Sequence, residues 1–126
     1  MDKDKKRILI TEDDASHRYL LSEIIANAGY EPIVAENGKV CIEKVKSQKP
    51  DLILMDIRMP VMDGEEAIKI LKSDPGARDI PIVCLTASVA QGSGAKDRLL
   101  SEGCDSYLEK PSEASIILGE IDKYLK

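Results

Sequence analysis

Short apolar runs alternate along the chain with longer segments whose apolar residues recur at helical spacing. Four of the five runs are too short for a helix and are bounded by Pro, Gly, Asp or Asn, which is typical of β-strands. The five predicted strands cover residues 8–10, 33–35, 52–55, 80–85 and 107–108. Two of them are almost continuously hydrophobic, as is expected of strands that are covered on both faces.

The segments between and after these strands carry five apolar stripes that predict five helices. Asn37 is placed to open the second helix, and Gly29 to end the first. Asp63, with Glu66 three residues later, forms a candidate capping box for the third helix, and the fifth is entered through Ser112. The stripes consist of Leu20, Leu21, Ile24, Ile25 and Ala28; Val40, Cys41 and Val45; Ala67, Ile68 and Leu71; Ala95, Leu99 and Leu100; and Ile117, Ile121, Tyr124 and Leu125.

Strands that alternate with helices five times predict a doubly wound (βα)5 domain of the α/β class. Its parallel sheet should lie between two layers of helices. No linker, internal repeat or low-complexity segment interrupts the pattern. We therefore expect a single domain over residues 1–126, with no residues left over for an effector domain. Sheets of this kind bind ligands at the carboxyl ends of their strands.

Composition narrows the classes of function. The chain has 126 residues, of which 43% are hydrophobic and 33% charged, so it is globular rather than disordered. Its net charge of −5 argues against direct binding to nucleic acid or to an anionic membrane. Neither a signal peptide nor an apolar stretch of membrane-spanning length is visible, so we expect a cytoplasmic protein.

The cysteines and the only histidine give no metal pattern. Cys41, Cys84 and Cys104 are widely spaced, and no Cys-x-x-Cys occurs, so zinc geometry is nearly excluded. We expect three reduced thiols that serve in packing. His17 lies one turn into the first predicted helix, where a solvated or partner-facing role is expected.

Side chains that carry chemistry follow four of the five predicted strands. Each has an ordinary explanation by itself, and for Asp14 a role as helix N-cap or dipole partner is the better one. Their joint placement at one edge of the sheet is not explained in that way. The residues are Glu12, Asp13 and Asp14 after the first strand, Asp56 at the end of the third, Thr86 at the end of the fourth, and Lys110 after the fifth.

This set suits metal-assisted phosphoryl transfer. Clustered carboxylates raise one another's pKa unless a cation lies among them. An all-oxygen site with room for water favours Mg²⁺ over zinc or calcium. The metal would neutralise a phosphoryl group moving onto Asp56, while the Lys110 ammonium and the Thr86 hydroxyl bind its oxygens. The pattern therefore predicts an acyl phosphate on aspartate.

Four segments of the chain resemble the receiver domain of two-component response regulators, a CheY-like superfamily. They are ILITEDD at 8–14, DLILMDIRMPVMDG at 51–64, IPIVCLTAS at 80–88 and DSYLEKP at 105–111. The resemblance implies a flavodoxin-like three-layer sandwich with strand order 2-1-3-4-5. It also implies Mg²⁺-dependent transfer from a histidine kinase or a histidine phosphotransfer protein. Phosphorylation would then switch the binding of a target protein to the face formed by the fourth helix, the fifth strand and the fifth helix. The sequence does not identify this target.

The resemblance also implies a role for each matching residue, in a signalling module rather than an enzyme. Asp56 is the phosphoacceptor, Lys110 and Thr86 assist it, and Thr86 and Tyr107 form the switch. Pro60 and Gly64 shape the following turn, where Gly64 is expected to adopt backbone angles closed to other residues. The implied metal ligands are Glu12, Asp13, Asp56 and the backbone carbonyl of Arg58.

Three alternative functions remain open at this point. An aspartyl-phosphate hydrolase would need a second acid two residues after Asp56, where this chain has Arg58. A flavodoxin-like flavin binder would need a phosphate-cradling loop, which is missing. The third alternative is a receiver-like domain that has the same fold but is not phosphorylated, and that binds proteins independently of phosphorylation. Within the receiver interpretation, the sequence is compatible with a stand-alone regulator and with part of a hybrid histidine kinase.

One segment departs from the family pattern. The stretch between Thr86 and Lys110 is slightly longer than usual, by an apparent insertion at Gly92-Ser93-Gly94. Two glycines so close together disfavour helix by about 1 kcal/mol each. We therefore expect the fourth helix to start late. Movement of Thr86 should then be coupled less tightly to the partner-binding face formed by the fourth helix, the fifth strand and the fifth helix. Arg58 and Ser88 could both modulate the lifetime of the phosphorylated state, and an exposed arginine that binds a partner or is solvated is the open alternative for Arg58.

Overall fold

The computed structural model of the chain describes residues 5–57, 62, 64–87, 100–101, 103–110 and 113–125, and the side chains of 86, 87 and 110 are not described. Its strands form one parallel sheet in the order β2-β1-β3-β4-β5, which confirms the predicted doubly wound fold and strand order. The elements are β1 (Arg7–Thr11), α1 (Ala15–Asn27), β2 (Glu31–Ala35), α2 (Gly38–Gln48), β3 (Leu52–Asp56), α3 (Gly64–Lys72), β4 (Ile82–Ala87), β5 (Ser106–Lys110) and α5 (Ala114–Leu125).

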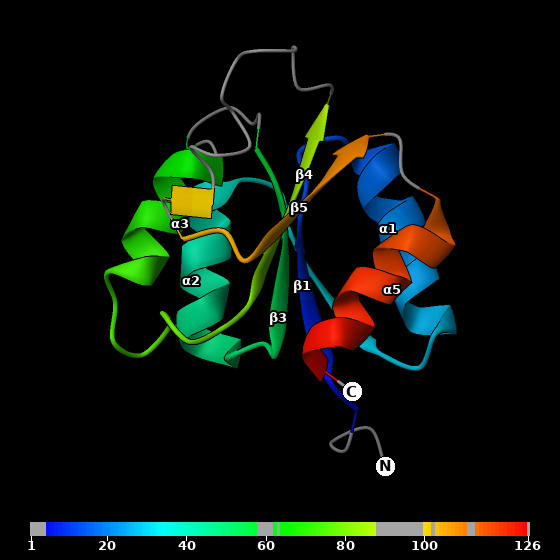
Figure 1. Cartoon of the computed structure of the whole chain (residues 1–126), viewed down its shortest axis with the longest axis horizontal. Helices are drawn as coiled ribbons and strands as arrows, with labels where there is room; N and C mark the ends of the chain where they lie inside the picture. Colours follow the sequence, from blue (N-terminus) through cyan, green and yellow to red (C-terminus); the bar gives the residue numbers. More distant parts are fainter. Residues whose placement is uncertain are drawn as a thin grey trace.

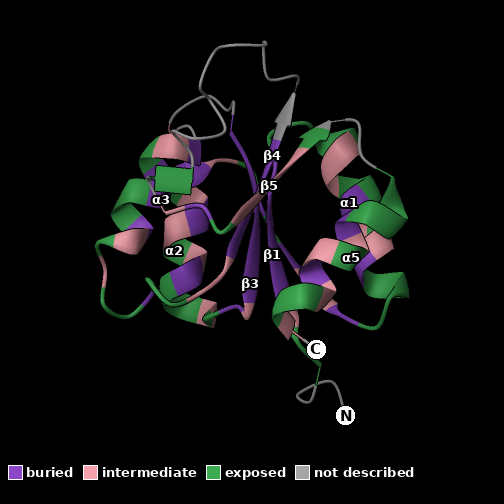
Figure 2. Cartoon of the chain, viewed as in Figure 1, coloured by how far each residue is buried: buried purple, intermediate pink, exposed green. Residues whose placement is uncertain are grey.

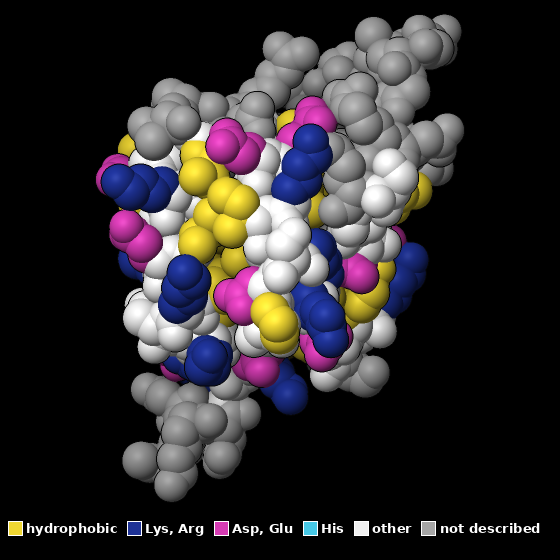
Figure 3. Space-filling model, turned by 90° about the vertical axis from the view of Figure 1, so that its left-hand side faces the viewer, with side chains coloured by type: hydrophobic (Ala, Val, Ile, Leu, Met, Phe, Trp, Pro, Cys, Tyr) yellow, Lys and Arg dark blue, Asp and Glu magenta, His cyan; other side chains and the backbone are white. Residues whose placement is uncertain are grey.

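The helices form a layer on each side of the sheet (Figure 1). Helices α1 and α5 cover one face, while α2 and α3 cover the other. On the outer side of the second layer, Lys and Arg are interspersed with Asp and Glu around apolar side chains (Figure 3). This mixed surface is typical of amphipathic helices that bury one stripe against a sheet.

Each face of the sheet has its own apolar core (Figure 2). Strand β3 is buried along its whole length. Its Ile53 and Met55 belong to the core under α2 and α3, whereas Leu52 and Leu54 belong to the core under α1 and α5. This double coverage accounts for the continuous apolar run of the third predicted strand. Cys41, Cys84 and Cys104 are all buried thiols without disulfide bonds, as predicted.

The predicted strand ends need three corrections. Strand β4 begins at Ile82 rather than residue 80, because Pro81 has no N–H to donate to a ladder. It runs through Ala87, so Thr86 is not its last residue as predicted. Strand β5 includes Lys110, which was expected to follow it.

Two of the predicted helix boundaries are confirmed. The Asn37 side chain accepts a hydrogen bond from the Val40 amide at 2.9 Å and caps α2. Helix α1 ends before Gly29, whose φ of 95° is disfavoured for other residues. Asp14 occupies the N-cap position of α1, but its side chain makes no capping hydrogen bond.

Several sequence predictions fall on residues outside the described part of the chain. The capping box at Asp63, the entry to the fifth helix at Ser112 and the Gly92-Ser93-Gly94 segment are among them. Most of the fourth predicted helix lies there too, although Leu100 and Ser101 are helical.

Candidate functional site

The sheet register brings two acidic residues together. Strands β1 and β3 are neighbours, and Thr11 pairs with Met55. The next residues, Glu12 and Asp56, therefore lie side by side at the carboxyl edge of the sheet. The Glu12 amide donates to the Ala35 carbonyl at 3.0 Å, which continues the contact between β1 and β2 one residue further.

Three carboxylates meet at this edge. Carboxylate oxygens of Glu12, Asp13 and Asp56 all lie within 4.8 Å of one another. Glu12 is only 2% exposed and Asp56 5%, whereas Asp13 is exposed. Buried like charges at this separation repel unless a cation lies among them. Hard oxygen donors and an open side toward solvent fit Mg²⁺.

Arg18 holds residues 12–14, here called the acidic turn, against the start of α1. Its Nη1 donates to the Glu12 carbonyl at 2.8 Å and lies 3.4 Å from the Asp13 carbonyl. The Arg18 amide donates to the Asp14 carbonyl at 2.8 Å. These bonds engage backbone carbonyls only, so they fix the turn while leaving the carboxylates to face the site.

His17 contacts the acidic cluster, whereas a solvated or partner-facing role is what its place in the sequence predicts. Its Nδ1 lies 2.6 Å from Glu12 Oε1, and its side chain is 28% exposed. The other Glu12 oxygen accepts a hydrogen bond from the Asp14 amide at 3.2 Å. The sequence held one sign of this contact: His17 lies in the first turn of α1, and a side chain there can reach back to the residues just before the helix.

Gly64 allows α3 to start against the backbone of β3. A Cβ at this position would lie 2.6 Å from the Asp56 carbonyl oxygen and 2.8 Å from Ile57 Cα. The Gly64 amide donates to the Ile57 carbonyl at 2.8 Å. The expected reason for this glycine is therefore wrong: its φ is not positive, and close approach is what excludes a side chain.

The backbones of Thr86 and Lys110 lie at or near the same edge. Asp56 pairs with Leu85 across β3 and β4, so Thr86 follows one residue further, and Ala87 pairs with Lys110. The side chains of Thr86 and Lys110 lie outside the described part of the structure, as do Arg58, Pro60 and Ser88.

Tyr107 lies on β5, which is separated by β4 from the strand that ends at Asp56. Its Cα pairs with Cys84 in the register of β4 and β5, and its partly buried ring packs against the core under α2 and α3. The ring is thus neither fully exposed nor part of the fully buried core.

The family is shown by comparison with known proteins. The family model of the response regulator receiver domain matches residues 8–122, and the chain belongs to this family. The chain is 35% identical over 120 residues to the polar-differentiation response regulator DivK of Brucella anthropi, covering 95% of this chain and 96% of that protein. The family membership inferred from the four motifs is therefore confirmed.

Solved structures agree with this assignment. The chemotaxis protein CheY4 of Vibrio cholerae superposes with a TM-score of 0.88 at 27% identity, covering 95% of this chain and 98% of that one. The receiver domain of the sensor histidine kinase PA1611 of Pseudomonas aeruginosa gives 0.86 at 28% identity, covering 96% and 98%. A magnesium ion is coordinated in the active site cleft of that neighbour. Within the described part of our chain, no helix has the length and apolar character needed to span a bilayer.

Proposed function

We propose that Asp56 accepts a phosphoryl group from a phosphohistidine on a histidine kinase or a histidine phosphotransfer protein. The P–N bond of the donor breaks as a P–O bond to the Asp56 carboxylate forms. The observation that carries the proposal is the position of Asp56, which ends the central strand within 4.8 Å of two other carboxylates. Family membership supports the same chemistry.

We further propose that Glu12, Asp13, Asp56 and the backbone carbonyl of Arg58 hold Mg²⁺. The donor set supports this choice, because it offers oxygen ligands only and concentrates negative charge at one point. The magnesium bound by the PA1611 receiver domain points the same way. When bound, the metal would neutralise charge on the phosphoryl group during transfer.

The remaining roles are proposed from family membership and are supported by position in the sheet. Thr86 and Lys110 would bind phosphoryl oxygens through a hydroxyl and an ammonium. Thr86 lies on β4, the strand next to that of Asp56, and Lys110 ends β5, one strand further along the same edge of the sheet. Movement of Thr86 would let Tyr107 turn inward and reshape the face formed by the fourth helix, β5 and α5. A downstream protein would read this change, so the chain acts as a switch and not as an enzyme with its own product.

The test is phosphorylation by a small phosphodonor with and without Mg²⁺, followed by mass mapping of the acyl phosphate. We expect one phosphate, dependent on Mg²⁺ and mapped to Asp56, and none in Asp56→Asn. Asp79→Asn, which removes an exposed acid elsewhere, serves as the matched control. Unchanged phosphorylation of Asp56→Asn would refute the assignment. Persistent turnover of phosphate esters would instead favour an aspartyl-phosphate hydrolase.

A further inference from the structure

We propose that His17 is a positioning residue for the metal site and acts through Glu12. The inference rests on the proposed function, because it concerns the affinity of the site for Mg²⁺. His17 itself does not belong to the group of side chains that can share one ion, which among the described residues consists of Glu12, Asp13 and Asp56. Its effect must therefore pass through the carboxylate that it contacts.

Each oxygen of the Glu12 carboxylate has a hydrogen-bond donor at the start of α1. The His17 imidazole lies 2.6 Å from Oε1, and the Asp14 amide lies 3.2 Å from Oε2. Because an ionised carboxylate only accepts, the imidazole must carry its proton on Nδ1. Both the neutral ring in that tautomer and the cation satisfy this requirement, so the bond does not depend on the charge of the ring. The shorter of the two contacts is the one from His17.

The contact with His17 opposes rotation of the Glu12 carboxylate away from the other two acids. The carboxylate is almost fully buried and lies beside those of Asp13 and Asp56, so repulsion favours rotation away from them. A donor on Oε1 holds the carboxylate in the cluster before any cation arrives. Groups that orient metal ligands in this way typically change metal affinity by about 10- to 100-fold when removed.

The acidic turn itself does not depend on His17. Arg18 binds the Glu12 carbonyl at 2.8 Å, and the Glu12 amide binds Ala35, so the backbone is held from two other sides. Loss of the imidazole should thus remove the donor on Glu12 Oε1 without unfolding the turn. This separation makes a role in metal binding distinguishable from a role in stability.

The experiment measures the Mg²⁺ dissociation constant of the full chain by isothermal titration calorimetry. His17→Leu removes the donor, whereas His17→Asn keeps an amide N–H near the place of Nδ1. Tyr19→Leu is the matched control, because Tyr19 is also an aromatic residue of α1 that bonds to a glutamate, but on the exposed surface, at 3.0 Å from Glu23. We expect affinity to fall by about 10-fold or more in His17→Leu, and to stay near wild type in His17→Asn and Tyr19→Leu. Urea unfolding in the presence of a chelator checks that each variant folds.

The outcomes separate the two proposals. If the wild-type chain does not bind Mg²⁺, the proposed function fails. If wild type binds and His17→Leu matches Tyr19→Leu, only the role of His17 is overturned. Equal weakening in His17→Leu and His17→Asn would also overturn it, since the donor would then not be the cause. Should His17→Leu fail to fold, His17→Gln replaces it: the longer side chain displaces the amide, so affinity below that of His17→Asn supports the proposal and equal affinity refutes it.

Discussion

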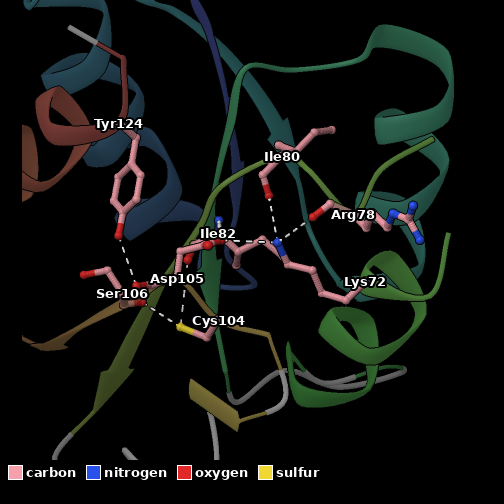
Figure 4. A network of polar contacts seen from close by, with 8 residues as sticks. All are labelled: Lys72, Arg78, Ile80, Ile82, Cys104, Asp105, Ser106 and Tyr124. Carbon is pink, nitrogen blue, oxygen red and sulfur yellow. Dashed lines mark hydrogen bonds and ion pairs between the residues drawn. The ribbon is translucent and has the colours of Figure 1, made fainter. Parts of the chain in front are cut away.

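The Asp105 carboxylate joins Lys72, at the end of α3, to Ile82, the first residue of β4 (Figure 4). Its Oδ2 accepts hydrogen bonds from Lys72 Nζ at 3.2 Å and from the Ile82 amide at 2.8 Å. The same ammonium group donates to the carbonyls of Arg78 and Ile80, at 2.9 and 3.1 Å. This network closes the α3–β4 connection at the amino edge of the sheet, opposite the acidic cluster.

Asp105→Ala should therefore lower stability without affecting the site. The Ile82 amide would lose its acceptor, which we expect to reduce the free energy of unfolding by about 1–3 kcal/mol. Asp105→Asn keeps a carbonyl acceptor and loses only the partly exposed ion pair, which is worth at most about 1 kcal/mol. Urea denaturation measures both changes, and equal stability of Asp105→Ala and wild type would contradict this account.

Gly64→Ala should damage both stability and metal binding. The added methyl group would meet backbone atoms of Asp56 and Ile57, which cannot rotate away. We expect a loss of about 1–3 kcal/mol and weaker Mg²⁺ binding, because the clash displaces the end of β3. Gly119→Ala is the control with the opposite sign. It lies inside α5 with open space around it and should stabilise the protein by about 0.5–1 kcal/mol.

Tyr30 should make stability depend on alkaline pH. Burial and a hydrogen bond to the Asp122 carboxylate raise the pKa of Tyr30 to about 12 from 10.0. A raised pKa means that the folded state holds the proton more tightly. The contribution is complete below pH 10 and disappears as the pH rises through about 12. It amounts to up to about 2–3 kcal/mol.

The measurement compares the free energy of unfolding of Tyr30→Phe and wild type over this range. The difference between them should shrink as the pH rises. Tyr19→Phe removes a phenol that is 68% exposed and should leave the profile nearly unchanged. A difference for Tyr30→Phe that stays constant with pH would refute the assignment.

Cys41 should be unreactive in the folded protein. The side chain is fully buried, and burial raises the pKa of its thiol to about 11. At pH 8 only about one molecule in a thousand would carry the reactive thiolate. Alkylation followed by peptide mapping should find Cys41 unmodified in buffer and modified in urea. Equal rates under both conditions would show that the thiol is accessible.

Periodicity and local capping were sufficient to predict most of the fold. The apolar runs located all five strands, and Asn37 and Gly29 marked helix boundaries, because these signals depend on neighbouring residues along the chain. The acids Glu12, Asp13 and Asp56 were found because parallel strands place their carboxyl ends at one edge. Their convergence did not require knowledge of any side-chain orientation.

Contacts across the fold were beyond such reasoning. Tyr30 and Asp122 are 92 residues apart, and the bond between them depends on how α5 lies beside the end of α1. The contact from His17 to Glu12 is local, but it depends on how the β1–α1 turn closes. Gly64 was correctly singled out for the wrong reason, since close approach to Asp56 is visible only in three dimensions.

Asp13→Asn should reverse its effect on stability when Mg²⁺ is added. Without metal, the substitution removes one of three mutually repelling charges, so the free energy of unfolding should rise, by on the order of 0.5 kcal/mol for this exposed group. With Mg²⁺ at 100 times its dissociation constant, wild type should gain about 2.7 kcal/mol, whereas the variant has lost a ligand and should gain much less. The order of stability should therefore invert.

Urea denaturation in chelator and in Mg²⁺ measures this inversion. Asp14→Asn is the matched control, because Asp14 is a neighbouring exposed acid that does not belong to the cluster. Its response to Mg²⁺ should equal that of wild type. A charge effect that merely reflects the acidity of the whole chain would move both variants alike, whereas a bound ion separates them. Equal stabilisation of all three proteins by Mg²⁺ would show that the ion binds elsewhere.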